Sequence, residues 1–123
     1  MTQFYKSVLE QDTAPVVLCD TDHTIVYMNG AACEHYKKYG GKSLEGKNLL
    51  ACHSKKSAQM IERILAWFRE ERSHNRVHTI FVEKENLDVY MIALRDDEGE
   101  LIGYYEKHEN RNRDESPLYD IGC

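Results

Sequence analysis

The sequence predicts an α+β domain in which helices cover one face of an antiparallel sheet. The first observation is the order of the patterns: β-rich runs gather near both ends of the chain, and helical patterns lie between them. The second is size, because 123 residues are about the length of one domain. The third is composition, since 41% apolar and 30% charged residues are typical of a globular chain. A disordered chain is thereby excluded, and no run is apolar enough to span a membrane.

The first predicted unit, residues 1–13, is a short amphipathic helix. Its apolar residues recur with the spacing i, i+1, i+4, i+5, which places one stripe along a helix. The residues of this stripe are Phe4, Tyr5, Val8 and Leu9.

A β-hairpin follows, built from residues 16–19 and 25–28. Both runs are apolar and rich in β-formers, and the polar turn of residues 20–23 joins them. Asn29 ends the second run, either as the cap of the next helix or as a corner that contacts a ligand. Residues 31–39 then predict a short helix, which two glycines close.

The strongest helical pattern begins at Ser54 or Ser57, and serine is a preferred N-cap. The helix is expected to end near residue 73. Apolar residues recur with a helical period, and charged residues occupy the opposite side. The apolar residues are Met60, Ile61, Ile64, Leu65, Trp67 and Phe68. We expect Trp67 and Phe68 to lie in the core.

Three further strands, residues 77–83, 87–94 and 101–105, complete the predicted sheet. Turn-forming residues stand at the reversals between them. Residues 110–123 are polar and predict an irregular tail, so the folded domain is residues 14–109. A cavity is expected between the sheet and the long helix, because the two layers cannot interdigitate everywhere.

Three stretches of the chain resemble the PAS domain family. Residues 20–29, DTDHTIVYMN, are similar to the first PAS hairpin, which has an Asp-rich turn and ends on Asn. Residues 44–49, LEGKNL, resemble the Gly-containing step before the long PAS helix. Residues 95–104, RDDEGELIGY, resemble the last hairpin, with its Asp-x-x-Gly turn and a Gly in the final strand. The three stretches occur in the same order and with the same spacing as in PAS domains, and the resemblance covers residues 5–109.

The resemblance implies a five-stranded antiparallel sheet with helices on one face and a sensory or regulatory role. It also implies a pocket between the sheet and the helices. The candidate pocket residues are Asn29, His35, Tyr36, Tyr39, Cys52, His53, Ile64 and Met91. Many members pair through an N-terminal helix, so we expect a homodimer formed through the stripe of residues 1–13. The alternative is that the stripe folds onto its own sheet.

Each cofactor that members of the family bind requires a particular residue in the sequence. Flavin photochemistry needs a Cys directly after the Gly-x-Asn step, but Leu49 follows Asn48 here. Members that bind haem place a His within the long helix, and residues 55–72 contain none. His53 precedes that helix and is the one nearby imidazole. Neither flavin nor haem is expected, and the identity of any cofactor is left open.

The stretch CHSKKS, residues 52–57, is the most distinctive local feature. It resembles a Cys-His-Pro-Pro-Lys-Ser stretch of a subset of bacterial PAS domains, with Ser54 and Lys55 in place of the prolines. One reading makes Cys52 a redox-sensitive thiol, because basic neighbours and a helix N-terminus favour the thiolate. The other makes Cys52 a buried residue beside a helix start that His53 and Ser54 organise.

Charge is unevenly distributed along the chain. The net charge of −5 argues against a nucleic-acid binder. The charged residues of the segment 37–63 are mostly basic. This pattern indicates either a site for an anionic ligand or partner, or a helical face exposed to solvent. No signal peptide and no paired cysteine ligands for zinc are visible, so a cytoplasmic protein without a structural metal is expected.

The leading functional hypothesis is a non-catalytic sensory module that binds a small ligand or senses redox state. It would signal through association with itself, with a downstream signalling protein or with an output domain. The alternative is a ligand-free module for protein interaction and dimerisation. Catalytic motifs such as a phosphate-binding loop, Gly-x-Ser-x-Gly or His-Glu-x-x-His are absent from the sequence, so an enzyme is not expected.

Overall fold

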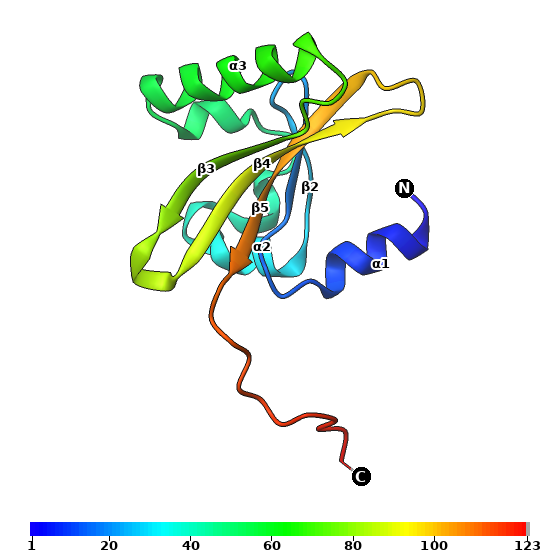
Figure 1. Ribbon diagram of the computed structural model, residues 1–123. Helices are drawn as coiled ribbons and strands as arrows, with labels where there is room; N and C mark the ends of the chain where they lie inside the picture. The colour runs from blue at the N-terminus through cyan, green and yellow to red at the C-terminus, as the bar shows by residue number, and fades with distance from the viewer. Residues whose placement is uncertain (123) are drawn as a thin grey trace.

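The computed structural model describes residues 1–122, apart from the side chain of Cys52. Five antiparallel strands form one sheet in the order β2-β1-β5-β4-β3 (Figure 1). The strands are β1 (Val17–Asp20), β2 (Ile25–Met28), β3 (Arg76–Val82), β4 (Leu87–Arg95) and β5 (Leu101–Asn110). The predicted α+β class with a five-stranded antiparallel sheet is confirmed. Strands β1 and β5 are far apart in the chain and adjacent in the sheet, so their pairing joins the two predicted hairpin groups.

The α-helices are α1 (Gln3–Gln11), α2 (Gly30–His35) and α3 (Lys55–Glu70). The described residues also include four short 3-10 helices: η1 (Lys37–Tyr39), η2 (Gly41–Leu44), η3 (Leu49–Cys52) and η4 (Glu83–Glu85). Leu65 and Phe68 of α3 are fully buried and belong to one core with Met91 and Tyr104 of the sheet. Ala32 of α2 joins the same core, so α2 and α3 cover one face of the sheet, whereas α1 projects to the side (Figure 1).

The last strand is longer than the sequence indicates. We expected it to end at residue 105, but β5 continues to Asn110, which pairs with Leu87 at the start of β4. Its added half, residues 106–110, has the sequence EKHEN and is polar throughout, so it lacks the apolar pattern of a strand. Backbone pairing along the whole of β4 forms this part of the strand instead.

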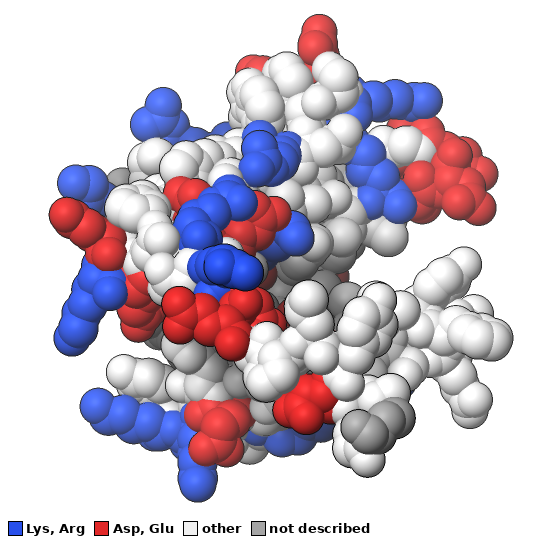
Figure 2. Space-filling view, turned by 60° about the horizontal axis from the view of Figure 1, so that its bottom comes forward, with Lys and Arg blue, Asp and Glu red and all other residues white. Residues whose placement is uncertain are grey.

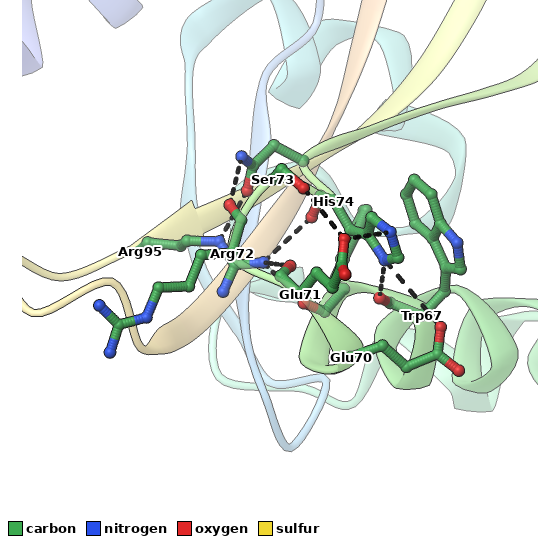
Figure 3. A network of polar contacts seen from close by, with 9 residues as sticks. Trp67, Glu70, Glu71, Arg72, Ser73, His74 and Arg95 are labelled. Atoms are coloured by element: carbon green, nitrogen blue, oxygen red, sulfur yellow. Dashed lines mark hydrogen bonds and ion pairs between the residues drawn. The ribbon is translucent and has the colours of Figure 1, made fainter.

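The C-terminal end of α3 is held by Arg95 of β4 (Figure 3). The guanidinium donates to the carbonyl oxygens of Phe68 and His74, at 2.6 and 3.0 Å. The Phe68 carbonyl belongs to the last turn of α3, whose carbonyl groups lack partners within the helix, and His74 lies in the segment that follows. Trp67, expected in the core, is 38% exposed and stacks on His74 with 3.8 Å between ring centroids. The prediction for Trp67 was wrong because neighbouring helical residues point about 100° apart, and Phe68 takes the buried direction.

Candidate functional site

A cavity of about 450 Å³ lies between α3 and the inner face of the sheet. One part of its wall is apolar and comes from both layers: Val17, Leu49, Ile61, Ile64, Val77 and Met91. Another part carries polar groups: Tyr36, His53, Lys56, Ser57, Tyr104 and Glu106. A mainly apolar wall with a few polar groups is typical of small-molecule sites, and this volume is in their usual range.

Four of the predicted pocket residues line this cavity, namely Tyr36, His53, Ile64 and Met91. Ile64 lies on the long helix that the apolar period predicted, and Met91 lies within the strand predicted over residues 87–94. His53 is held at the start of α3, where its Nδ1–H donates to the carbonyl oxygen of Leu49 at 2.9 Å. The side chain of Cys52 lies outside the described residues, so both readings of that thiol stay predictions.

Asn29 does not line the cavity, because its side chain is fully buried and binds the backbone. Its Oδ1 accepts from the backbone N–H groups of Val16 and Ala32, at 3.0 and 2.8 Å. Its amide group donates to the carbonyl oxygens of Leu9 and Ala14, at 2.9 and 3.0 Å. Asn29 thus caps α2, as one sequence interpretation held, and in addition holds the end of α1 against the sheet.

His35 and Tyr39 also lie outside the cavity wall. His35 is exposed on α2 and contacts the ring of Tyr36 edge-on, with 4.7 Å between centroids. Tyr39 is 67% exposed on η1. The helical period explains the difference: of the three aromatic residues in this segment, Tyr36 alone points toward the sheet and packs against the core.

Sequence reasoning missed a chain of polar groups that reaches the cavity wall from the surface. Cys19 and Tyr104 line the cavity, and the thiol and the hydroxyl share a hydrogen bond. Behind them, Nδ1 of His23 lies 2.9 Å from the hydroxyl oxygen of Tyr104. Nε2 of His23 lies 2.5 Å from Oε1 of Glu62, on the exposed side of α3. His23 belongs to a polar turn yet is 6% exposed, which a local pattern does not reveal.

Burial keeps the thiol and the phenols of the cavity protonated at neutral pH. Desolvation raises the pKa of Cys19 to about 11, although the hydrogen bond with Tyr104 opposes the rise. Desolvation, aided by the charge of Glu106, raises the pKa of Tyr36 to about 12. Burial also raises the pKa of Tyr104. The cavity therefore offers neutral hydrogen-bonding groups rather than nucleophiles at this part of its wall.

The charged groups at the cavity are few and come from its edges. Lys56 lies near the start of α3, and Glu106 lies on β5 beside His108, with 2.9 Å between Nε2 and Oε1. Figure 2 shows blue and red side chains intermixed over much of the face that it displays. Within the basic stretch of residues 37–63, Lys42 forms an ion pair with Glu45 at 2.9 Å.

An antiparallel sheet with helices on one face and a ligand-sized cavity between them defines a small α+β domain with a candidate ligand site. The chain belongs to the PAS family, since a family model described as the PAS fold matches residues 9–107. PAS domains are sensory modules of signalling proteins and are generally non-catalytic. Among residues 1–122, no helix is long and apolar enough to cross a membrane.

Several solved structures share the fold at low sequence identity. A PAS domain from Colwellia psychrerythraea has a TM-score of 0.64 and 9% identity, covering 88% of this chain and 94% of that one. A sensory box sensor histidine kinase from Vibrio cholerae has a TM-score of 0.59 and 16% identity, covering 89% and 91%. The Aer2 receptor from Vibrio cholerae, described as a dual PAS-heme oxygen sensor, has a TM-score of 0.54 and 20% identity, covering 80% and 94%. A comparison with curated proteins finds no match.

Proposed function

We propose that this PAS domain is a non-catalytic sensor that binds a small ligand in the cavity between α3 and the sheet. The observation that carries the proposal is the cavity itself, because its mainly apolar wall includes neutral donors and acceptors. Both layers of the fold contribute to the wall, so a ligand there would contact α3 and the sheet together. Occupancy would then change how α3 packs, and a partner would read that change.

Filling the cavity is expected to abolish ligand retention without unfolding the domain. Ile64→Trp adds a large side chain at a half-buried wall position. Native mass spectrometry of gently purified wild-type protein should show extra mass, which this variant should lose. Ile102→Trp is the matched control, since Ile102 is 52% exposed and lies outside the wall. A clean apo mass for the wild type would reject the sensor in favour of a ligand-free module.

A second candidate function, self-association, is favoured by the stripe on α1. Phe4, Tyr5 and Val8 are 86%, 68% and 70% exposed, whereas Leu9 is half-buried. In this structure the three exposed side chains of the stripe do not pack on the sheet of their own chain. Apolar side chains in a row on an exposed helix are typical of an interface. We therefore propose that the stripe pairs with a second copy of the chain. The signal would then be transmitted through this contact between the two N-terminal helices.

Disrupting the stripe is expected to shift the chain to monomer. Phe4→Glu places a charge at the most exposed apolar position of α1 and leaves the buried core untouched. Sedimentation at micromolar concentration should show a dimer for the wild type and a monomer for this variant. Gln3→Glu on the same helix is the matched control, because Gln3 is exposed and the change adds the same single negative charge. A wild type that stays monomeric throughout would rule out this interface.

A further inference from the structure

The wall of the cavity carries one positive and one negative side chain, and each comes from a different layer of the fold. Among the described residues that line the cavity, Lys56 and Glu106 are the two with a Lys, Arg, Asp or Glu side chain. Lys56 lies in the first turn of α3, and Glu106 lies on β5 opposite Met91 of β4. A molecule that binds both charges therefore joins the helix layer to the sheet.

The Lys56 ammonium is available to a ligand. It forms no hydrogen bond and no ion pair within residues 1–122. By contrast, Lys42 of the same basic stretch pairs with Glu45 at 2.9 Å. An ammonium group has three N–H donors on a flexible stem of four carbons, so the Lys56 side chain can turn toward a carboxylate in the cavity.

The Glu106 carboxylate keeps one oxygen available. Its Oε1 lies 2.9 Å from Nε2 of His108, and its Oε2 has no partner in the part of the chain that the structure describes. The negative charge acts inside the cavity: burial, and after it the charge of Glu106, raises the pKa of Tyr36, another residue of the wall, to about 12. Oε2 can therefore accept a charge-assisted hydrogen bond from an ammonium group of a ligand.

The remaining polar groups of the wall are neutral or already have partners. Nδ1 of His53 lies 2.9 Å from the carbonyl oxygen of Leu49, and Nε2 of His78 lies 2.8 Å from Oδ1 of Asp88. The thiol and the phenols are protonated at neutral pH, because burial raises their pKa values. The two charges described above are therefore the groups that distinguish one ligand from another by charge.

Charge complementarity disfavours three classes of ligand. An anion is attracted by Lys56 and repelled by Glu106, and a cation experiences the reverse. An uncharged molecule removes water from both charges without replacing it. A molecule with both a carboxylate and an ammonium group avoids all three costs. The apolar wall requires the rest of the molecule to be apolar, and a cavity of about 450 Å³ has room for an aromatic ring.

We infer that the cavity selects an amino acid with an apolar side chain, whose carboxylate binds Lys56 and whose ammonium group binds Glu106. This inference rests on the proposed ligand-binding function and names the ligand chemistry. The side chain of the ligand packs on the apolar wall, which includes Ile61 and Ile64 of α3 and Met91 of β4. Since its two charges bind α3 and β5, the amino acid holds the helix against the sheet, and a partner would read that change.

Three probes that share one aromatic ring test the assignment: phenylalanine carries both charges, phenylpropionate only the carboxylate, and phenethylamine only the ammonium group. Binding is measured by ligand-detected NMR titration on the full chain at neutral pH, where these groups are ionised. Wild-type protein should bind phenylalanine at least about fivefold more tightly than either other probe, the upper value for one exposed ion pair. Ile64→Trp should lose phenylalanine, which locates it in the cavity.

Two substitutions remove the charges one at a time. Lys56→Gln should weaken phenylalanine and phenylpropionate about fivefold without weakening phenethylamine. Glu106→Gln should weaken phenylalanine and phenethylamine without weakening phenylpropionate. Both side chains are exposed, so folding is preserved. Lys55→Gln and Glu34→Gln are the matched controls, because these residues carry the same charges, are exposed and lie outside the wall. Both controls should bind the three probes as the wild type does.

The outcomes distinguish the ligand class from the proposed function. If phenylpropionate or phenethylamine binds as tightly as phenylalanine, or if each variant weakens all three probes alike, the amino-acid assignment is refuted and the cavity remains a ligand site. If no probe binds at millimolar concentration, the assignment is refuted as well, and the native mass of the purified chain decides the sensor function independently. Equal effects of Lys56→Gln and Lys55→Gln would indicate general surface charge rather than a site, and would also overturn the assignment.

Discussion

Asn29→Ala is expected to lower the free energy of unfolding by about 3–5 kcal/mol, because it leaves buried backbone donors without acceptors. The N–H groups of Val16 and Ala32 both end on Oδ1 of Asn29, and the three residues are at most 3% exposed. Each such donor costs about 1–3 kcal/mol when its partner is removed, and the bond to Ala32 is also the cap of α2, so the cap is already included in this sum. Urea unfolding followed by circular dichroism measures the change.

Asn48→Ala is the matched control for this prediction. Asn48 is also an N-cap, and its side chain accepts from the backbone N–H of Leu50 at 2.8 Å, but it is exposed. Water replaces the lost bond there, so a loss of no more than about 1 kcal/mol is expected. Equal unfolding free energies for the two variants would show that the buried network of Asn29 contributes little.

The same substitution should release α1 from the sheet. The Asn29 amide donates to the carbonyl oxygens of Leu9 and Ala14, which lie at and just beyond the end of that helix. Hydrogen exchange of residues 3–11 should therefore speed up in Asn29→Ala more than exchange within α3. The Asn29 side chain therefore links the position of α1, with its exposed apolar stripe, to the sheet that forms one wall of the cavity.

Local patterns predicted those parts of the fold in which the decisive contacts repeat along the chain. The period of α3 identified Leu65 and Phe68 as core residues, and both are fully buried. The second half of β5 escaped prediction because its partner strand, rather than its own apolar pattern, makes it a strand. Asn29 was recognisable as a helix cap from its position, but its bond to Leu9 spans 20 residues.

The same difference holds for the candidate site: local patterns predicted some of its residues, but contacts between residues far apart in the chain were not predicted. Ile64 belongs to the apolar period that predicted α3, Met91 lies within the strand predicted over residues 87–94, and both residues line the cavity. The contacts of His23 with Glu62 and Tyr104 were missed because these residues are 39 and 81 positions away from it in the chain. Within its own segment, His23 is one more polar residue of a turn. Its burial follows from the arrival of Glu62 and Tyr104, which only the assembled fold brings together.

Gly103→Ala is expected to cost at least about 3 kcal/mol of unfolding free energy, or to prevent folding. A Cβ atom at this position would lie 2.2 Å from the carbonyl oxygen of Cys19 and 3.2 Å from its carbonyl carbon. Both are backbone atoms of the paired strand, so no side-chain rotation relieves the clash. Strands β1 and β5 would have to move apart. Urea unfolding, or the yield of folded protein where unfolding is already complete, measures the effect.

Gly30→Ala is the control, because a Cβ there meets nothing within 4 Å. Gly30 begins α2, where alanine is the better helix former, so stability should hold or rise by up to about 1 kcal/mol. If Gly103→Ala unfolds with the wild-type free energy, the close approach of β1 and β5 does not determine stability. The position also bears on the candidate site, since Cys19 pairs directly with Tyr104 across this contact and both residues line the cavity. Any variant that separates the two strands therefore also separates two residues of the cavity wall, so the glycine that joins the two halves of the sheet also shapes the cavity.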